Sequence, residues 1–201
     1  MNRMTATASV GSRGTDSVTL IKTAAMAQNL KASGIDFCLQ YLGSVTSEII
    51  DVILSAGLAF MPVTYADKFN AQATVDELKT LNIPPCTVWL DVEGVTGMSA
   101  QALIAAINTW AIAVQAAGFE AGLYVGAGCP LTSVELYRLK VTRYWHSDSR
   151  TVDRNGADSC PACGWCLYQL FPSVTWGGVW VDVNFVQEDW RGRLPSWVKA
   201  A

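Results

Sequence analysis

Residues 86–94 read Cys-Thr-Val-Trp-Leu-Asp-Val-Glu-Gly, an apolar run that ends in two acids and a glycine. A strand that is buried on both faces has such a continuous apolar sequence, as the strands of parallel sheets do. Barrels of parallel strands carry their functional groups where the strands end. The stretch therefore predicts a central parallel strand with a polar site at its carboxyl end.

Short apolar runs of this kind recur along the chain, with helical patterns between the early ones. The expected strands are a weak first strand ending at Asp16, then residues 34–42, 58–65, 86–92, 121–125, 141–146, 165–170 and 179–185. The expected helices cover residues 19–32, 46–57, 74–81, 99–118 and 131–139. Eight strands that alternate with helices predict an α/β protein with a single TIM-like (β/α)8 barrel.

The barrel should be irregular, because 201 residues are fewer than the roughly 250 that are typical of this fold. The segment before residue 179 is turn-like and holds Gly177-Gly178, so helices should be missing or short in the last units. An open doubly wound sheet is the alternative, but the Gly-x-Gly-x-x-Gly loop that it usually carries is absent. We expect one barrel domain over residues 12–201, preceded by a flexible arm at residues 1–11.

Composition excludes several classes of protein. Apolar residues make up 51% of the chain and charged residues 15%, with a net charge of −3, which argues against disorder and against nucleic-acid binding. No apolar run reaches the roughly 18–20 residues of a membrane span. The first residues form no apolar secretory signal, so we expect the protein to stay inside the cell or to leave by a route that this chain does not encode.

The cysteines leave two interpretations open. Three of the six form a C-x2-C-x2-C pattern at Cys160, Cys163 and Cys166. A zinc site needs about four ligands, and the single histidine, His146, is distant in sequence, so a local disulfide or buried thiols are favoured over zinc. We expect no metal and no cofactor.

Four acids are expected to meet at the mouth of the barrel. Asp16 ends the first strand, Asp91 and Glu93 end the fourth, and Asp182 lies near the end of the eighth. The first and eighth strands become neighbours when a barrel closes. Asp91 and Glu93 are two residues apart, so within a strand their side chains would point to the same side. Crowded carboxyls, one protonated and one ionised, suit glycoside hydrolysis. The alternative is that each acid only caps a turn.

Aromatic residues near the strand ends support a sugar site, because sugar rings pack their C–H faces on aromatic planes. The candidates for substrate binding are Tyr41, Tyr65, Asp67, Tyr124, Trp145, His146 and Gln169. For each aromatic residue, simple core packing is the alternative. Trp89, Trp110 and Trp180 are assigned to packing.

The motifs together resemble a known family. The relevant stretches are Gly14-Thr15-Asp16, Asp91-Val92-Glu93, Gly122-Leu123-Tyr124, Tyr144-Trp145, Tyr168-Gln169, Gly177-Gly178-Val179 and Val181-Asp182-Val183-Asn184. In order and spacing they resemble the family 25 glycoside hydrolases, lysozymes of the Chalaropsis type, and the related DUF1906 glycoside hydrolase-like group. The resemblance covers about residues 12–190.

The resemblance implies a flattened, irregular barrel and N-acetylmuramidase cleavage of peptidoglycan. Glu93 would be the general acid, and Asp91 would orient the substrate's acetamido group or stabilise positive charge. Asp16 and Asp182 would be the acids of the first and last strands. We therefore expect a monomeric peptidoglycan hydrolase of the cell wall, such as a phage or prophage endolysin. A catalytically inactive glycan-binding barrel and an intracellular enzyme with another small substrate are the alternatives.

Overall fold

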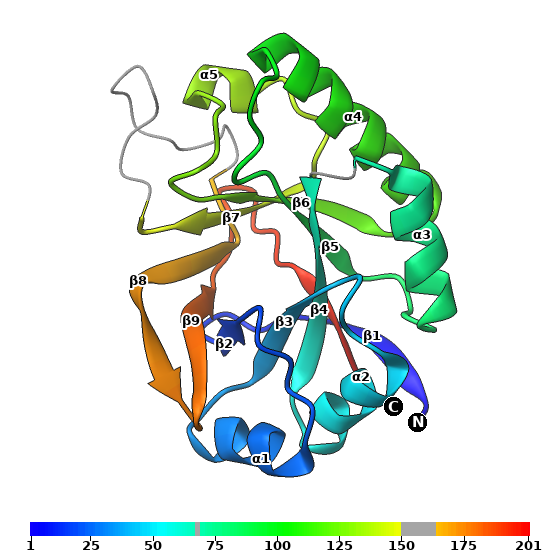
Figure 1. Cartoon of the computed structure of the whole chain (residues 1–201), viewed down its shortest axis with the longest axis vertical. Helices are drawn as coiled ribbons and strands as arrows, with labels where there is room; N and C mark the ends of the chain where they lie inside the picture. The colour runs from blue at the N-terminus through cyan, green and yellow to red at the C-terminus, as the bar shows by residue number, and fades with distance from the viewer. Residues whose placement is uncertain (67–68, 150–163) are drawn as a thin grey trace.

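The chain folds into a closed eight-stranded barrel with helices along part of its outside (Figure 1). The computed structural model describes residues 1–66, 69–149 and 164–201. The barrel strands are β2 (Arg13–Asp16), β3 (Phe37–Tyr41), β4 (Ala59–Tyr65), β5 (Thr87–Asp91), β6 (Glu120–Val125), β7 (Arg143–Ser147), β8 (Leu167–Trp176) and β9 (Val179–Val186). Neighbouring strands pair in chain order, and β9 pairs with β2 to close the ring. The predicted α/β barrel is confirmed.

The last barrel strand runs in the opposite direction to the others. Strands β2 to β8 run parallel to one another, whereas β9 is antiparallel to both β8 and β2. The cause is local, because Gly177 and Gly178 adopt positive φ values of 58° and 82° and join β8 to β9 directly as a hairpin. The amino-terminal half of β9 therefore lies at the mouth. Asp182 is placed in the middle of β9 rather than near its carboxyl end.

Five helices cover part of the outside of the barrel within the described residues, and all of them precede β7. They are α1 (Ala24–Ala32), α2 (Ser47–Ser55), α3 (Ala71–Thr80), α4 (Ala100–Ala116) and α5 (Ser133–Leu136). Thr46 and Ser99 cap α2 and α4 as their sequences indicate. The expected start of a helix at Thr74 is wrong, because the side chain of Asn70 accepts from the N–H of Ala73 and starts α3 one turn earlier.

The first residues are ordered by a distant partner. Residues 3–7, which were expected to form part of a flexible arm, make strand β1 (Arg3–Thr7) and pair antiparallel with β10 (Ser196–Ala200). Strand β10 also contacts β4 through Val198 and Phe60. The polar, small residues of β1 carry little local signal, because its pairing joins the two ends of the chain.

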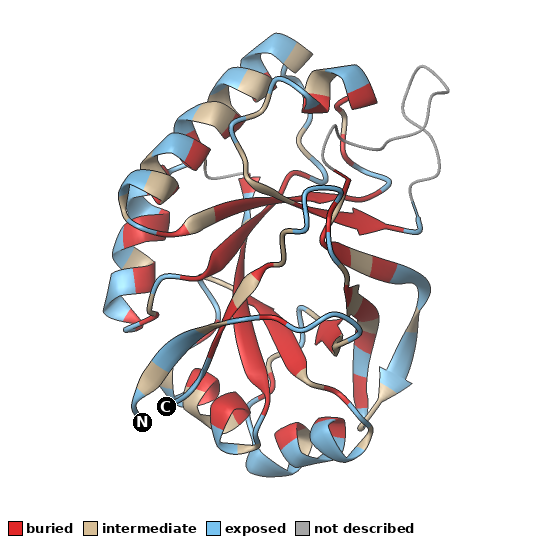
Figure 2. Ribbon diagram, turned by 180° about the vertical axis from the view of Figure 1, so that it is seen from behind, coloured by how far each residue is buried: buried red, intermediate tan, exposed pale blue. Residues whose placement is uncertain are grey.

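Apolar side chains fill both the inside and the outside of the barrel wall. Figure 2 shows buried residues along most of the barrel strands, and helices whose outward faces are exposed. Trp89 and Trp145 belong to the cluster inside the barrel, and Trp110 belongs to the cluster between strands and helices. A Cβ at Gly14 would lie 2.1 Å from the ring of Phe37, so this position leaves space only for a hydrogen. The interior is therefore a packed core, and the site is confined to its mouth.

Three further expectations concern membrane spans, the cysteines and metal binding. None of the helices in the described part of the chain is long and apolar enough to cross a membrane. Cys166 is a buried free thiol, while Cys160 and Cys163 lie outside the described residues. Across residues 1–66, 69–149 and 164–201, no group of three histidine, cysteine or acidic side chains is arranged to hold a metal ion.

Candidate active site

Asp16 lies at the centre of the polar cluster at the mouth. It is the last residue of β2 and is 5% exposed. One of its oxygens, Oδ2, accepts from the amide of Asn184 at 2.7 Å and from the amide of Gln169 at 2.9 Å. Burial, and then the charge of Asp182, raise the pKa of Asp16 to about 7, although the two amides partly oppose the rise. The carboxyl therefore exchanges its proton near neutral pH.

Asp182 faces Asp16 directly across the β2–β9 pairing. The Gln169 amide that binds Asp16 also donates to Asp182, at 3.4 Å, and the hydroxyl of Ser173 donates to the other oxygen of Asp182. The carbonyl of Gln169 accepts from the hydroxyl of Tyr124 at 2.6 Å. One glutamine therefore orients two acids and a tyrosine, so Gln169 has a positioning role.

Asp91 ends β5 in register with Tyr65 of β4 and Tyr124 of β6. Its two oxygens accept from the N–H of Glu93 at 2.9 Å and from the hydroxyl of Tyr41 at 3.1 Å. Burial raises the pKa of Asp91 to about 6, and these two hydrogen bonds act in the opposite direction. Above this pH, Asp91 is a mostly ionised carboxylate held by two donors.

Glu93 differs from the sequence prediction in its placement. Strand β5 ends at Asp91, and the chain then turns so that the N–H of Glu93 meets the Asp91 carboxylate. The two acids therefore do not share a strand face. Glu93 is exposed, and its Oε1 accepts from the N–H of Gly128 at 3.0 Å. A Cβ at Gly126 would lie 2.2 Å from this oxygen, so the loop after β6 leaves room for it.

The four acids do converge. Burial raises the pKa of Tyr124 well above its usual value, and the charges of Glu93, Asp16 and Asp91 add to the rise. Asp182 pairs with Asp16 in the strand register. All four carboxyls therefore lie around one mouth, as the sequence predicts.

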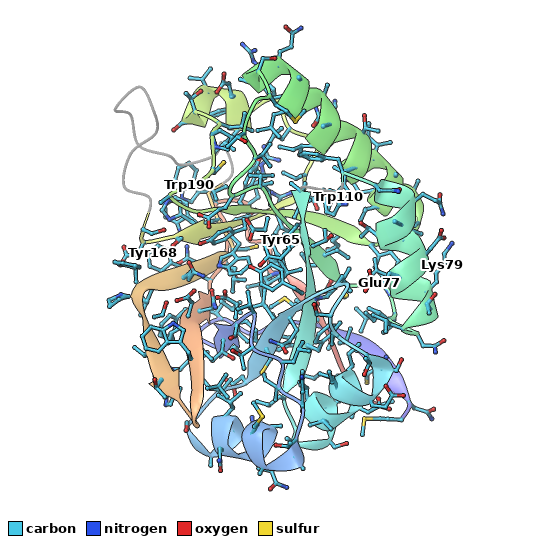
Figure 3. The ribbon with its side chains drawn as sticks, in the orientation of Figure 1. Tyr65, Glu77, Lys79, Trp110, Tyr168 and Trp190 are labelled. Carbon is cyan, nitrogen blue, oxygen red and sulfur yellow. The ribbon has the colours of Figure 1, made fainter. Side chains whose placement is uncertain are left out.

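A cavity of about 530 Å³ opens beside Glu93. It lies between the loops that follow β4 and β5, and is lined by Tyr65, Ala66, Phe69, Glu93, Gly94, Val95, Thr96 and Met98. The ring of Tyr65 is 41% exposed and stacks on Tyr41, with 4.3 Å between the ring centroids. Figure 3 shows Tyr65 near the centre of the ring of strands. An exposed acid thus borders a space with largely apolar walls.

Two of the predicted substrate-binding residues do not face the mouth of the barrel. Trp145 is fully buried inside the barrel, where its ring lies 4.4 Å from that of Tyr124, so it forms part of the floor and does not reach a ligand. His146 is the next residue of β7 and points the opposite way, where its ring stacks on Trp165, with 4.4 Å between the centroids, and lies parallel to the ring of Tyr168 of β8 at 5.9 Å. Both predictions are wrong for this reason. Asp67 lies outside the described residues.

Three residues show what the sequence interpretation missed. Asn184 is two residues from Asp182 on the same strand face, a spacing that was available in the sequence. Ser173 is brought to Asp182 by an irregularity of β8 between Leu170 and Val174, which no local pattern indicates. The assignment of Trp180 to packing is wrong, because its side chain is 63% exposed.

Fold and site together define an α/β barrel with an acid-lined mouth, and comparison with solved structures gives the same fold. The chain is similar to a glycosyl hydrolase 25 of Streptococcus pneumoniae, named GHIP and described as a virulence factor that participates in host cell invasion. The TM-score is 0.60 at 14% identity, over 88% of this chain and 87% of that one. A xylose isomerase-like TIM barrel/4-hydroxyphenylpyruvate dioxygenase fusion protein has a TM-score of 0.48 at 11% identity, over 69% and 27% of the two chains. No protein-family model and no curated protein sequence matches the chain.

Proposed function

We propose that the chain is a glycoside hydrolase that cleaves the glycan strands of peptidoglycan as an N-acetylmuramidase. The observation that carries the proposal is the convergence of four carboxyls at one barrel mouth, each of which accepts a hydrogen bond from a side-chain or backbone donor. Glu93 is the exposed member of the set and borders a cavity. The structural likeness to a glycosyl hydrolase 25 protein supports the same class.

In the proposed reaction, protonated Glu93 donates to the oxygen of the scissile glycosidic bond. The bond between that oxygen and the anomeric carbon breaks, and positive charge develops on the sugar. Ionised Asp91 stabilises this charge from its two-donor position. Water adds its hydroxyl to the anomeric carbon, and its remaining proton returns to Glu93, which balances the hydrolysis.

The surroundings of Glu93 support an N-acetylated substrate. Sugar rings pack on exposed aromatic faces such as that of Tyr65, and an acetamido methyl group suits apolar walls such as those of the cavity. In this proposal the Asp91 carboxylate accepts a hydrogen bond from the N–H of the substrate's acetamido group. Within this proposal the protein is a monomer that acts on the cell wall, in the role of an endolysin released by a separate lysis or export route.

The test compares wild type with Glu93→Gln on purified peptidoglycan, following turbidity and newly formed reducing ends. Loss of the general acid should slow hydrolysis by roughly 100- to 10,000-fold. Glu188→Gln is the matched control, because Glu188 is exposed beyond the end of β9 that lies opposite the mouth. Equal lysis by wild type and Glu93→Gln would contradict the assignment of the acid. Wild-type binding to peptidoglycan without any reducing ends would instead identify the inactive glycan-binding barrel.

A further inference from the structure

The hairpin of β8 and β9 extends the mouth on the side opposite the Glu93 cavity. Along β9, Val179, Val181 and Val183 are buried on one face, while Trp180 and Asp182 occupy the other face. Strand β9 is antiparallel to β2 and its Asp182 faces the last residue of β2. Residues of β9 that precede Asp182 therefore lie beyond the rim, and Trp180 is the next side chain outward from the acid.

The backbone of the hairpin is anchored to the barrel, whereas the side chain of Trp180 is exposed. A Cβ at Gly177 would lie 3.1 Å from the backbone of Leu30, so the turn rests on α1. The backbone carbonyl of Trp180 accepts from the hydroxyl of Ser17 at 2.7 Å, which fixes the hairpin to the loop after β2. The indole of Trp180 is nevertheless 63% exposed. Its backbone is anchored while its aromatic surface remains available.

Polar groups accompany this indole on the same face. Thr175 pairs with Trp180 across the hairpin, and Ser173, which bonds Asp182, lies two residues before Thr175. We call Ser173, Thr175 and Trp180 the hairpin platform. An aromatic plane flanked by hydroxyls matches the apolar face and the polar rim of a pyranose ring. The platform is continuous with the acids, because the hydroxyl of its Ser173 donates to Asp182.

We infer that the hairpin platform is a second glycan-binding subsite, in which Trp180 stacks on a sugar of the same strand that is held at Glu93. The inference rests on the proposed function, since it takes the glycan strand as ligand. The strand would cross the mouth from the cavity beside Glu93, past the acids, to the hairpin. The platform would contribute affinity for long strands and would not take part in bond cleavage.

The test measures equilibrium binding to insoluble purified peptidoglycan by sedimentation in the cold. Trp180→Ala should raise the dissociation constant roughly tenfold, because one aromatic contact corresponds to about a factor of ten. Trp180→Phe should restore most of the affinity, since it keeps an aromatic face. Trp190→Ala is the matched control, because Trp190 is 72% exposed and lies against Gly164, at the end of the barrel opposite the mouth.

The outcomes separate this inference from the proposed function. Binding by Trp180→Ala equal to wild type, or equal weakening in Trp190→Ala, would overturn the platform. If wild type releases reducing ends but its binding does not depend on Trp180, the hydrolase is supported and the platform is overturned. Binding that depends on Trp180, without any release of reducing ends, would support the platform and overturn the hydrolase. Absence of wild-type binding to peptidoglycan would overturn both.

Discussion

Replacing Asp16 with asparagine should stabilise the fold by an amount that grows as the pH rises. Burial, together with the charge of Asp182, raises the pKa of Asp16 from 3.8 to about 7 in the native state. In the unfolded chain the same carboxyl ionises near its ordinary pKa. Asparagine keeps an oxygen that accepts from Gln169 and Asn184 and carries no charge, so it removes the effect of ionisation while keeping the contacts.

The sign follows from proton binding. Below about pH 4 the carboxyl is protonated in both states, and ionisation contributes nothing to the free energy of unfolding. Between about pH 4 and pH 7 the unfolded state loses the proton first, so the wild type loses stability as the pH rises. Above about pH 7 the native carboxyl ionises too, and the loss stays constant.

The magnitude follows from the same numbers. A rise from 3.8 to about 7 corresponds to about 4 kcal/mol, at about 1.4 kcal/mol for each tenfold change in the ionisation constant. Urea unfolding followed by tryptophan fluorescence from pH 4 to pH 8.5 should show the advantage of Asp16→Asn growing by up to this amount. Asp76→Asn, at an exposed position of α3, is the control and should show no such trend. A constant difference between Asp16→Asn and wild type across the range would refute the reasoning.

Three further perturbations test the packing and the site. Gly14→Ala should destabilise the fold by about 1–3 kcal/mol in urea unfolding, because the added methyl group would lie 2.1 Å from a buried ring; unchanged stability would contradict the close packing. Tyr124→Phe should cost about 1–3 kcal/mol in the same assay, because the carbonyl of Gln169 loses its donor; a neutral result would show that the contact is dispensable. Tyr41→Phe removes a hydrogen bond that lowers the pKa of Asp91, so the acid limb of kcat/KM, expected near pH 6 in wild type, should move to higher pH. An acid limb that stays in place or moves lower would contradict the role given to Asp91.

The barrel could be predicted from the sequence because its signal is local. A strand such as residues 87–91 is buried on both faces, so its own composition indicates its environment. Asp16 and Asp182 could be paired because closure of a barrel makes the first and last strands neighbours. The antiparallel direction of β9 follows from the short Gly177-Gly178 connection, yet the count of eight strands alone suggests a parallel one.

The remaining features depend on the ends of strands and on distant partners. Glu93 leaves the strand because its N–H binds the Asp91 carboxylate, and a two-residue spacing does not reveal where a strand stops. Trp145 and His146 are consecutive residues of β7. Trp145 faces the inside of the barrel and His146 the outside, and the sequence does not show which of the two faces inward. Trp180 alternates with buried valines along β9, and this pattern does not show that its own face extends beyond the rim of the barrel.

The pairing of β1 with β10 has a practical consequence. It places the two ends of the chain side by side, with the N–H of Ala201 donating to the carbonyl of Asn2 at 3.1 Å (Figure 1). A short peptide bridge could join these ends, and new ends opened in an exposed loop would then give a circularly permuted protein. Such a rearrangement would leave every contact among the mouth carboxyls in place, so retained activity in the permuted chain would show that the site does not depend on the order in which the strands are connected.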